Sequence, residues 1–178
     1  FLQGGDDWGI SVALVSEGEP VLAAFFAPAR GEMYMAGDGA GAWLNETKLN
    51  AAPMSDLDDA RMMGDQAGFR SKFWPHPWPE NMAVLPANSI ALRLCMIAGG
   101  QADCCVTLRP KNIWDMASAD LILSEAGGSV KTAEGAPLTY NKDKPVLDHI
   151  VATRPGLEGA LMDRVSPALK KQKDDGET

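Results

Sequence analysis

Positive charge is scarce in this chain of 178 residues, and no hydrophobic run is long enough to cross a membrane. The 16 lysines and arginines are outnumbered by 24 aspartates and glutamates, which gives a formal net charge of -8 at pH 7. A chain this acidic has no general attraction for nucleic-acid polymers or for anionic membranes. No signal peptide is visible either, so we expect neither kind of partner.

Cysteine and histidine are also few, and their spacing excludes several classes of site. Cys95, Cys104 and Cys105 lie inside apolar runs without a CxxC spacing, which argues against a disulfide framework and against a zinc site. They predict buried, reduced thiols in a cytoplasmic protein. His76 and His149 have no partner at nucleophile–base spacing, so we do not expect a histidine-dependent hydrolase.

The first 50 residues consist of short apolar runs separated by turn signals. Hydrophobic residues make up 46% of the chain, which is enough for a proper core. Turns such as Ser16–Pro20 and Pro28–Gly31 separate β-rich runs, and this pattern predicts an antiparallel meander without a helix before about residue 50. The expected strands are 8–15, 21–27, 33–36 and 42–45.

The polar segment 53–59 predicts a boundary between two layers. Residues 1–55 would form the second part of an N-terminal α+β domain, and residues 56–178 a C-terminal α/β domain. A strand is expected at 60–65. The segment 71–86 holds four prolines and two tryptophans, and this density of proline predicts an ordered loop over a cleft, without regular structure.

Helical periodicity begins near residue 88. Apolar residues share one helical face from Ile90 to Ala98, with Asn88 or Ser89 as the N-cap. Alternating strands and helices then predict an α/β layer. The expected elements are a strand at 103–108, a helix at 115–126, strands at 129–132 and 149–153, and a last helix at 156–165 that Pro167 limits.

The segment Arg109–Asp115 is the most informative one for chemistry. A predicted strand ends, a short basic loop follows, and Asp115 opens a predicted helix. Asp115 fits an N-cap or first-turn acid stabilised by the helix dipole, and it also fits an oxygen ligand for a divalent cation in the crevice of an α/β sheet. Arg109 and Lys111 suit either a solvated loop or a phosphate held beside a metal. The residues alone leave both alternatives open.

Glu125 stands near the end of the same predicted helix, followed by Gly127 and Gly128. We interpret the glycines as a C-cap and Glu125 most simply as an exposed residue of the last turn, with an acid–base role as the alternative.

Three groups of residues together resemble the inositol monophosphatase family. Trp114–Ala119 and Leu121–Gly128 are similar to its WDxAx signature with a downstream EAGG, and Ser89–Cys95 with Ala98–Asp103 is similar to its GSxAL helix and following strand. Residues 1–4, 8–14 and 39–45 match the stretch that follows the family's DPxDGTxxF motif. The resemblance runs from residue 1 to about residue 165.

The resemblance implies a layered αβαβα sandwich of the sugar-phosphatase type, with its first layers incomplete. It implies hydrolysis of a small phosphate monoester by metal-activated water, with Mg²⁺ as the cofactor, and it allows a homodimer. Asp115 would be a metal ligand, and Ser89, Arg109 and Lys111 would bind the substrate. The other metal ligands and the catalytic residues would lie upstream of residue 1, so these 178 residues alone are expected to be inactive.

Two departures from the family pattern bear on the substrate. Asn88 replaces the usual glycine, and Leu108 stands where inositol-specific members tend to carry a glutamate. With Arg109 and Lys111 nearby, a 3'(2'),5'-bisphosphate nucleotide becomes an alternative to an inositol monophosphate. A non-catalytic family member with a binding or regulatory role is the third alternative.

Overall fold

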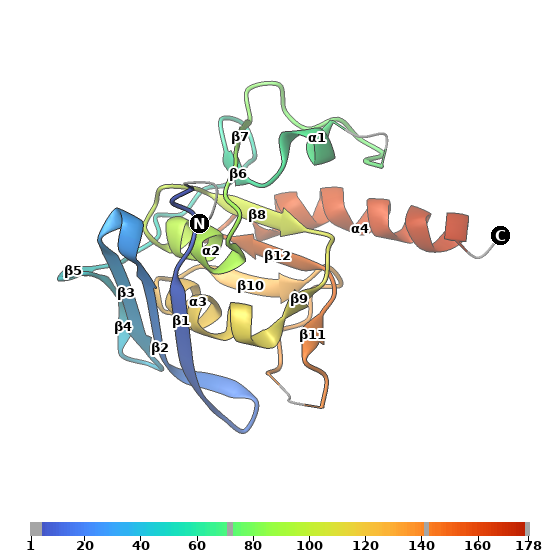
Figure 1. Ribbon diagram of the computed structural model, residues 1–178. Coiled ribbons are helices and arrows are strands. Elements are labelled where there is room, and N and C mark those ends of the chain that lie inside the picture. The colour runs from blue at the N-terminus through green and yellow to red at the C-terminus, as the bar shows by residue number, and fades with distance from the viewer. Residues whose placement is uncertain (1–4, 71–72, 141–142, 177–178) are drawn as a thin grey trace.

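The first sheet of the computed structural model is an antiparallel meander, as predicted from the turns (Figure 1). The structure describes residues 5–70, 73–140 and 143–176, with side chains to residue 169, so the first four residues of the family resemblance lie outside it. A single 3₁₀ turn, Pro28–Arg30, occupies a predicted turn, and the last short strand was not predicted. The strands, which pair in chain order, are β1 (Ile10–Ser16), β2 (Glu19–Ala27), β3 (Glu32–Gly37), β4 (Gly41–Leu44) and β5 (Thr47–Lys48).

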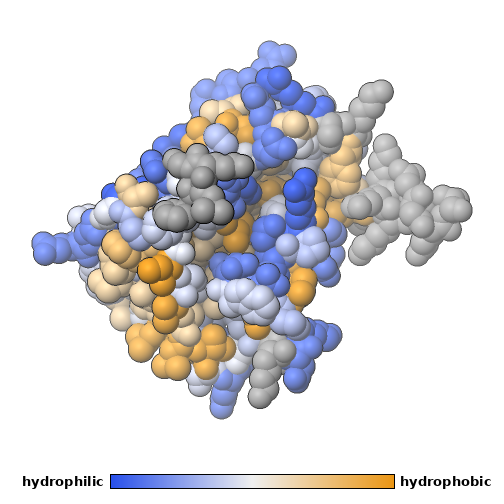
Figure 2. All heavy atoms as spheres, in the orientation of Figure 1, coloured by the Kyte–Doolittle hydropathy of each residue, from blue (hydrophilic) through white to orange (hydrophobic). Residues whose placement is uncertain are grey.

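The two faces of this sheet have different surroundings. One face buries Phe25 and Tyr34 against helices, whereas the other exposes large apolar side chains on β1, β2 and β3. Figure 2 shows hydrophobic residues along the lower left of the molecule, the side on which Figure 1 places this sheet. The exposed apolar residues of this face are Ile10, Val12, Leu14, Leu22 and Met35.

The second sheet is mixed, with strand order β10-β12-β8-β6-β7. β6 runs parallel to β7 and β8, whereas β12 runs antiparallel to β8 and β10. A separate two-stranded pair joins β9 to β11. The strands are β6 (Arg61–Met63), β7 (Ala83–Leu85), β8 (Cys104–Thr107), β9 (Lys111–Asn112), β10 (Ser129–Thr132), β11 (Val146–Leu147) and β12 (Ile150–Thr153).

The expectation that 71–86 has no regular structure is wrong for β7. This strand lies between Pro79 and Pro86 and contains no proline itself, and it sits at the edge of the sheet, where neighbouring prolines remove no ladder hydrogen bond. A short helix, α1 (Gln66–Phe69), was also not predicted, and its N-cap Asp65 accepts a hydrogen bond from the Ala67 N–H.

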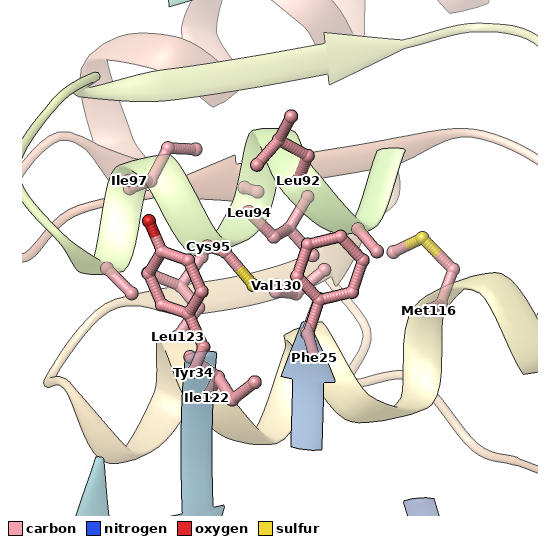
Figure 3. Close-up of a cluster of buried hydrophobic side chains, with 14 of the residues drawn as sticks. Phe25, Tyr34, Leu92, Leu94, Cys95, Ile97, Met116, Ile122, Leu123 and Val130 are labelled. Carbon is pink, nitrogen blue, oxygen red and sulfur yellow. The ribbon is translucent and has the colours of Figure 1, made fainter. Parts of the chain in front are cut away.

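Helices α2 (Ile90–Ala98) and α3 (Ile113–Glu125) lie between the two sheets, and α4 (Glu158–Gly176) covers the far face of the second sheet (Figure 1). Successive side chains of the second sheet point to opposite faces. Cys105 and Ile150 face the layer of α2 and α3, whereas Val106 and Val151 face α4. Figure 3 shows Phe25 and Tyr34 of the first sheet pointing toward Leu92 on α2 and Leu123 on α3. These layers confirm the predicted α+β layered fold.

Pro167 does not end the last helix, contrary to expectation, because α4 runs through it to Gly176. Leu157, Leu161 and Val165 are fully buried at helical spacing, and Ala168 and Leu169 beyond the proline are also buried. Their burial against the second sheet offsets the hydrogen bond that a proline removes from a helix interior.

The three cysteines are buried and unpaired, as predicted. Within the described residues, no helix is both long and apolar enough to span a membrane. The larger core cluster contains residues from both sheets. The division into two domains at residue 55 stays a prediction.

Candidate functional site

A cavity of about 360 Å³ lies where α2 and α3 begin, beside β1. Three of the four predicted site residues line it: Ser89, Lys111 and Asp115. Arg109 does not; it is exposed and lines a neighbouring cavity. The folded chain therefore brings together a carboxylate, an ammonium group and a helix N-terminus that are up to 26 residues apart in sequence.

Asp115 lies in the first turn of α3 and is half-buried. The N-cap position belongs to Asn112, so the N-cap interpretation of Asp115 is wrong; the helix begins two residues earlier than expected because β9 leads directly into it. The Asn112 side-chain amide donates to Asp115 Oδ2 at 3.5 Å, a long contact, and Asp115 lines the cavity. A first-turn acid and a metal ligand both remain compatible with this position.

The N-terminus of α2 forms the opposite wall. Ser89 is its N-cap, as predicted, and its Oγ accepts a hydrogen bond from the Leu92 N–H at 3.2 Å. Ile90 and Ala91 follow and also line the cavity, and N–H groups in a first helical turn have no partner within the helix. Together with the positive end of the helix dipole, they make this wall suited to an anion.

Lys111 is crowded by other cations. Burial lowers the pKa of its ammonium group, and repulsion from Arg93, and more weakly from Arg109, lowers it further. Among the described residues, no ion pair joins any of these three cations to an acid. An anionic ligand would relieve this repulsion, so the electrostatics favour a phosphate group here.

Arg93 was missed by the sequence analysis. It is the one charged residue in α2, where seven of nine residues are buried, and that isolation is the signal that could have revealed it. Its Nε donates to the Ala87 carbonyl at 2.7 Å, which holds the half-buried guanidinium group beside the loop that leads into the helix.

Gly9 and Ser11 also line the cavity without having been predicted. A Cβ on Gly9 would lie 2.4 Å from the Phe25 ring, so the cavity wall has no space for a side chain there. Ser11 Oγ lies 2.7 Å from Ser118 Oγ, and this contact ties β1 to α3 just beyond Asp115.

Glu125 is not the exposed residue that we expected. It is half-buried, and its two carboxylate oxygens accept hydrogen bonds from the N–H groups of Gly39 at 2.9 Å and Gly41 at 2.6 Å. The glutamate thus connects the end of α3 to the β3–β4 turn. It lies outside the cavity of Asp115, so an acid–base role there has no support.

The donor set suits a hard divalent cation but is small. Asp115 is the only acid that lines the described cavity, and a carboxylate oxygen is a ligand that Mg²⁺ prefers. Within the part of the chain that the structure describes, no group of three or more His, Cys, Asp or Glu residues could hold a metal ion. These residues therefore fit one ligand of a metal centre and do not form a complete one.

Two stacked sheets with helices between and outside them, and an anion-suited cavity at two helix N-termini, define a layered α+β protein with a ligand crevice. A sequence profile described as the inositol monophosphatase family matches residues 1–171. The chain belongs to this family.

Curated relatives carry several different names. The chain is 34% identical over 154 residues to the Nus factor SuhB of Xylella fastidiosa, covering 81% of this chain and 54% of the relative. It is 36% identical over 143 residues to the inositol-1-monophosphatase of Rhizobium meliloti, covering 76% and 53%. It is 28% identical over 153 residues to the 3'(2'),5'-bisphosphate nucleotidase CysQ of Escherichia coli, covering 83% and 60%.

The fold has a close counterpart among solved structures. The IMPase of Thermotoga maritima superposes with a TM-score of 0.81 at 25% identity, covering 96% of this chain and 65% of that one. The chain thus spans between half and two thirds of the length of these relatives.

Proposed function

We propose that this chain forms the substrate-facing part of a Mg²⁺-dependent phosphomonoesterase, acting on inositol monophosphate or a related small phosphate monoester. One observation carries the proposal: a single cavity joins Asp115, Lys111 and the N-terminus of α2. A phosphate ester needs a cation-rich, hydrogen-bond-donating cradle beside a metal ligand, and this cavity offers those groups. The inositol-1-monophosphatase among the relatives supports the same reaction class.

Each wall of the cavity has its own task in this proposal. The N–H groups at the start of α2, oriented by the Ser89 cap, hold phosphate oxygens, and Lys111 balances their charge. Asp115 supplies one carboxylate oxygen to Mg²⁺. When bound, Mg²⁺ would lower the pKa of the attacking water and neutralise the phosphate. The remaining metal ligands would come from outside these 178 residues, so the chain alone is expected to bind Mg²⁺ weakly and to be inactive.

A second candidate function is hydrolysis of a 3'(2'),5'-bisphosphate nucleotide. Arg93 and Arg109 both repel the charge of Lys111, and among the described residues no salt bridge joins any of these three cations to an acid, so the cluster suits a second phosphate. The likeness to the CysQ nucleotidase supports this alternative. A non-catalytic role, a homodimer and a cytoplasmic location stay predictions.

The proposal is tested by assaying phosphate release from inositol 1-phosphate and from 3'-phosphoadenosine 5'-phosphate, using the protein at its full natural length. We expect chelation with EDTA to abolish turnover of the preferred ester and added Mg²⁺ to restore it. Lys111→Ala should raise KM for both esters, and more strongly for the bisphosphate. Absence of Mg²⁺-dependent release from either ester, in a folded protein, would contradict the proposed function and favour the non-catalytic alternative.

A further inference from the structure

Asn88 lies at the boundary between two cavities. The cavity of about 360 Å³ that holds Asp115 adjoins a second cavity of about 480 Å³, and the described residues that line both are Asn88 and Lys111. If the phosphate of an ester occupied the first cavity, the rest of the ester would pass these two side chains on leaving it. A group that contacts Asn88 is therefore close to the ester oxygen.

The residues on either side of Asn88 are held in place by hydrogen bonds. Arg93 Nε donates to the Ala87 carbonyl at 2.7 Å, and the Leu92 N–H donates to Ser89 Oγ at 3.2 Å. Ala87 is buried, whereas Asn88 between these two anchored neighbours is exposed. The position of Asn88 is thus set before a ligand arrives, and a pre-formed site loses less entropy on binding.

The side-chain amide of Asn88 is available to a ligand. Among the residues whose side chains the structure describes, none forms a hydrogen bond with it. An amide offers two N–H donors and a carbonyl acceptor, whereas the Lys111 ammonium group offers donors alone. Leu108, in the second cavity, offers neither. Of the two side chains at the boundary, Asn88 is therefore the one that can accept a hydrogen bond from a hydroxyl group.

We infer that Asn88 is a specificity-determining residue, whose amide pairs with a hydroxyl group on the carbon next to the phosphate-bearing carbon. The enzyme then prefers phosphate esters with such a vicinal hydroxyl group to esters without one, because only the former replace the water that hydrates the amide. Asn88 stands where the family pattern usually has a glycine, which has no side chain to make this contact. The inference rests on the proposed phosphatase function and adds a feature of its substrate.

The test compares two esters in the protein at its full natural length with Mg²⁺. Inositol 1-phosphate carries vicinal hydroxyl groups, and cyclohexyl phosphate has the same ring without them. Asn88→Leu removes the hydrogen-bonding groups at a similar side-chain size, so it should raise KM for inositol 1-phosphate by about 2- to 12-fold, the effect of one hydrogen bond. KM for cyclohexyl phosphate should not rise, and kcat for both esters should stay within about twofold.

Asn88→Gly also lacks the amide and should separate the two esters in the same way. Asn50→Leu is the matched control, because Asn50 is exposed and lines neither cavity, and it should leave both KM values unchanged. An equal rise of KM for both esters in the two Asn88 variants, or no rise for inositol 1-phosphate, would overturn the inference while leaving the phosphatase function intact. Absence of turnover of both esters in the wild type would instead contradict the proposed function, and with it the inference.

Discussion

Asp103 is a buried carboxylate that connects strands of the second sheet. It is 2% exposed, and its carboxylate accepts hydrogen bonds from Arg61 at 2.8 and 2.9 Å and from Arg154 at 2.6 Å. Burial alone would raise the pKa of this carboxyl group, but hydrogen bonds from Arg61 and then Arg154 outweigh burial, and the pKa is lowered overall. The contacts tie β8 to β6 and to the residue that follows β12.

We predict that Asp103→Asn lowers the free energy of unfolding by about 3 kcal/mol, because the charges of Arg61 and Arg154 lose their anionic partner, and only the Arg61 side chain, 38% exposed, can be solvated in exchange. Since the folded-state pKa lies below the unfolded value of about 3.9, this stabilisation is present above that pH and is lost as pH falls through the folded pKa. Urea unfolding at pH 7 and pH 3 should therefore show a smaller difference between wild type and variant at pH 3.

Asp7→Asn provides the control, because Asp7 pairs with Arg30 at 3.3 Å on the surface, with 28% of its side chain exposed. An exposed pair contributes at most about 1 kcal/mol. Equal destabilisation by the two variants at pH 7 would contradict the role given to Asp103.

A local signal places a residue in an element but does not give its role. Ser89 was correctly predicted as an N-cap, whereas the helix of Asp115 begins two residues earlier than predicted, and the roles of both residues at the site stay predictions. The role of Arg93 could not be predicted, because a single cation in a helix is usually expected to face solvent. Only the tertiary structure places it beside Lys111.

At the scale of elements, α3 connects both sheets, and Glu125 is one of its attachments to the first one, beside the Ser11–Ser118 contact. Two charge-assisted hydrogen bonds from the Gly39 and Gly41 N–H groups end on this one carboxylate. We predict that Glu125→Gln lowers the free energy of unfolding by about 1 to 3 kcal/mol, because a neutral amide with a single acceptor oxygen cannot bind both N–H groups as strongly. Urea unfolding measures the loss, and amide hydrogen exchange should accelerate at Gly39 and Gly41.

Glu46→Gln is the matched control, since Glu46 is exposed in the turn between β4 and β5. Unchanged exchange at both glycines in Glu125→Gln would show that the turn holds its shape without the glutamate.

Elements with strong periodicity were predicted within one or two residues, as for β2, α2 and β12. The wrong predictions all involve proline or very short segments. β7 forms because β6 provides a parallel partner strand. α4 continues through Pro167 because Val165 and Leu169, on either side of the proline, are buried. In each case long-range packing, which a local pattern does not contain, decides the outcome.

For the whole molecule, the order of elements predicted a meander and an α/β layer, and the family resemblance implied the layered sandwich, but the full lining of the crevice could not be predicted. Ser89 and Asp115 belong to helices whose N-termini meet only after both sheets have packed on the middle layer. The exposed apolar face of the first sheet is a second property of the folded chain that strand prediction did not reveal, because the alternation does not say which face is covered.

The proposed phosphatase function depends most on Asp115. Its most direct test is the turnover of the Asp115→Asn variant, made in the protein at its full natural length. We predict that kcat for phosphate release at saturating Mg²⁺ falls by at least about 100-fold, because an amide lacks the charge that holds the metal. Thermal stability should change little, since a first-turn acid contributes only about 0.3 to 1 kcal/mol. Asp163→Asn, on the exposed side of α4, should keep full activity. Undiminished turnover in a folded Asp115→Asn variant would contradict the central claim.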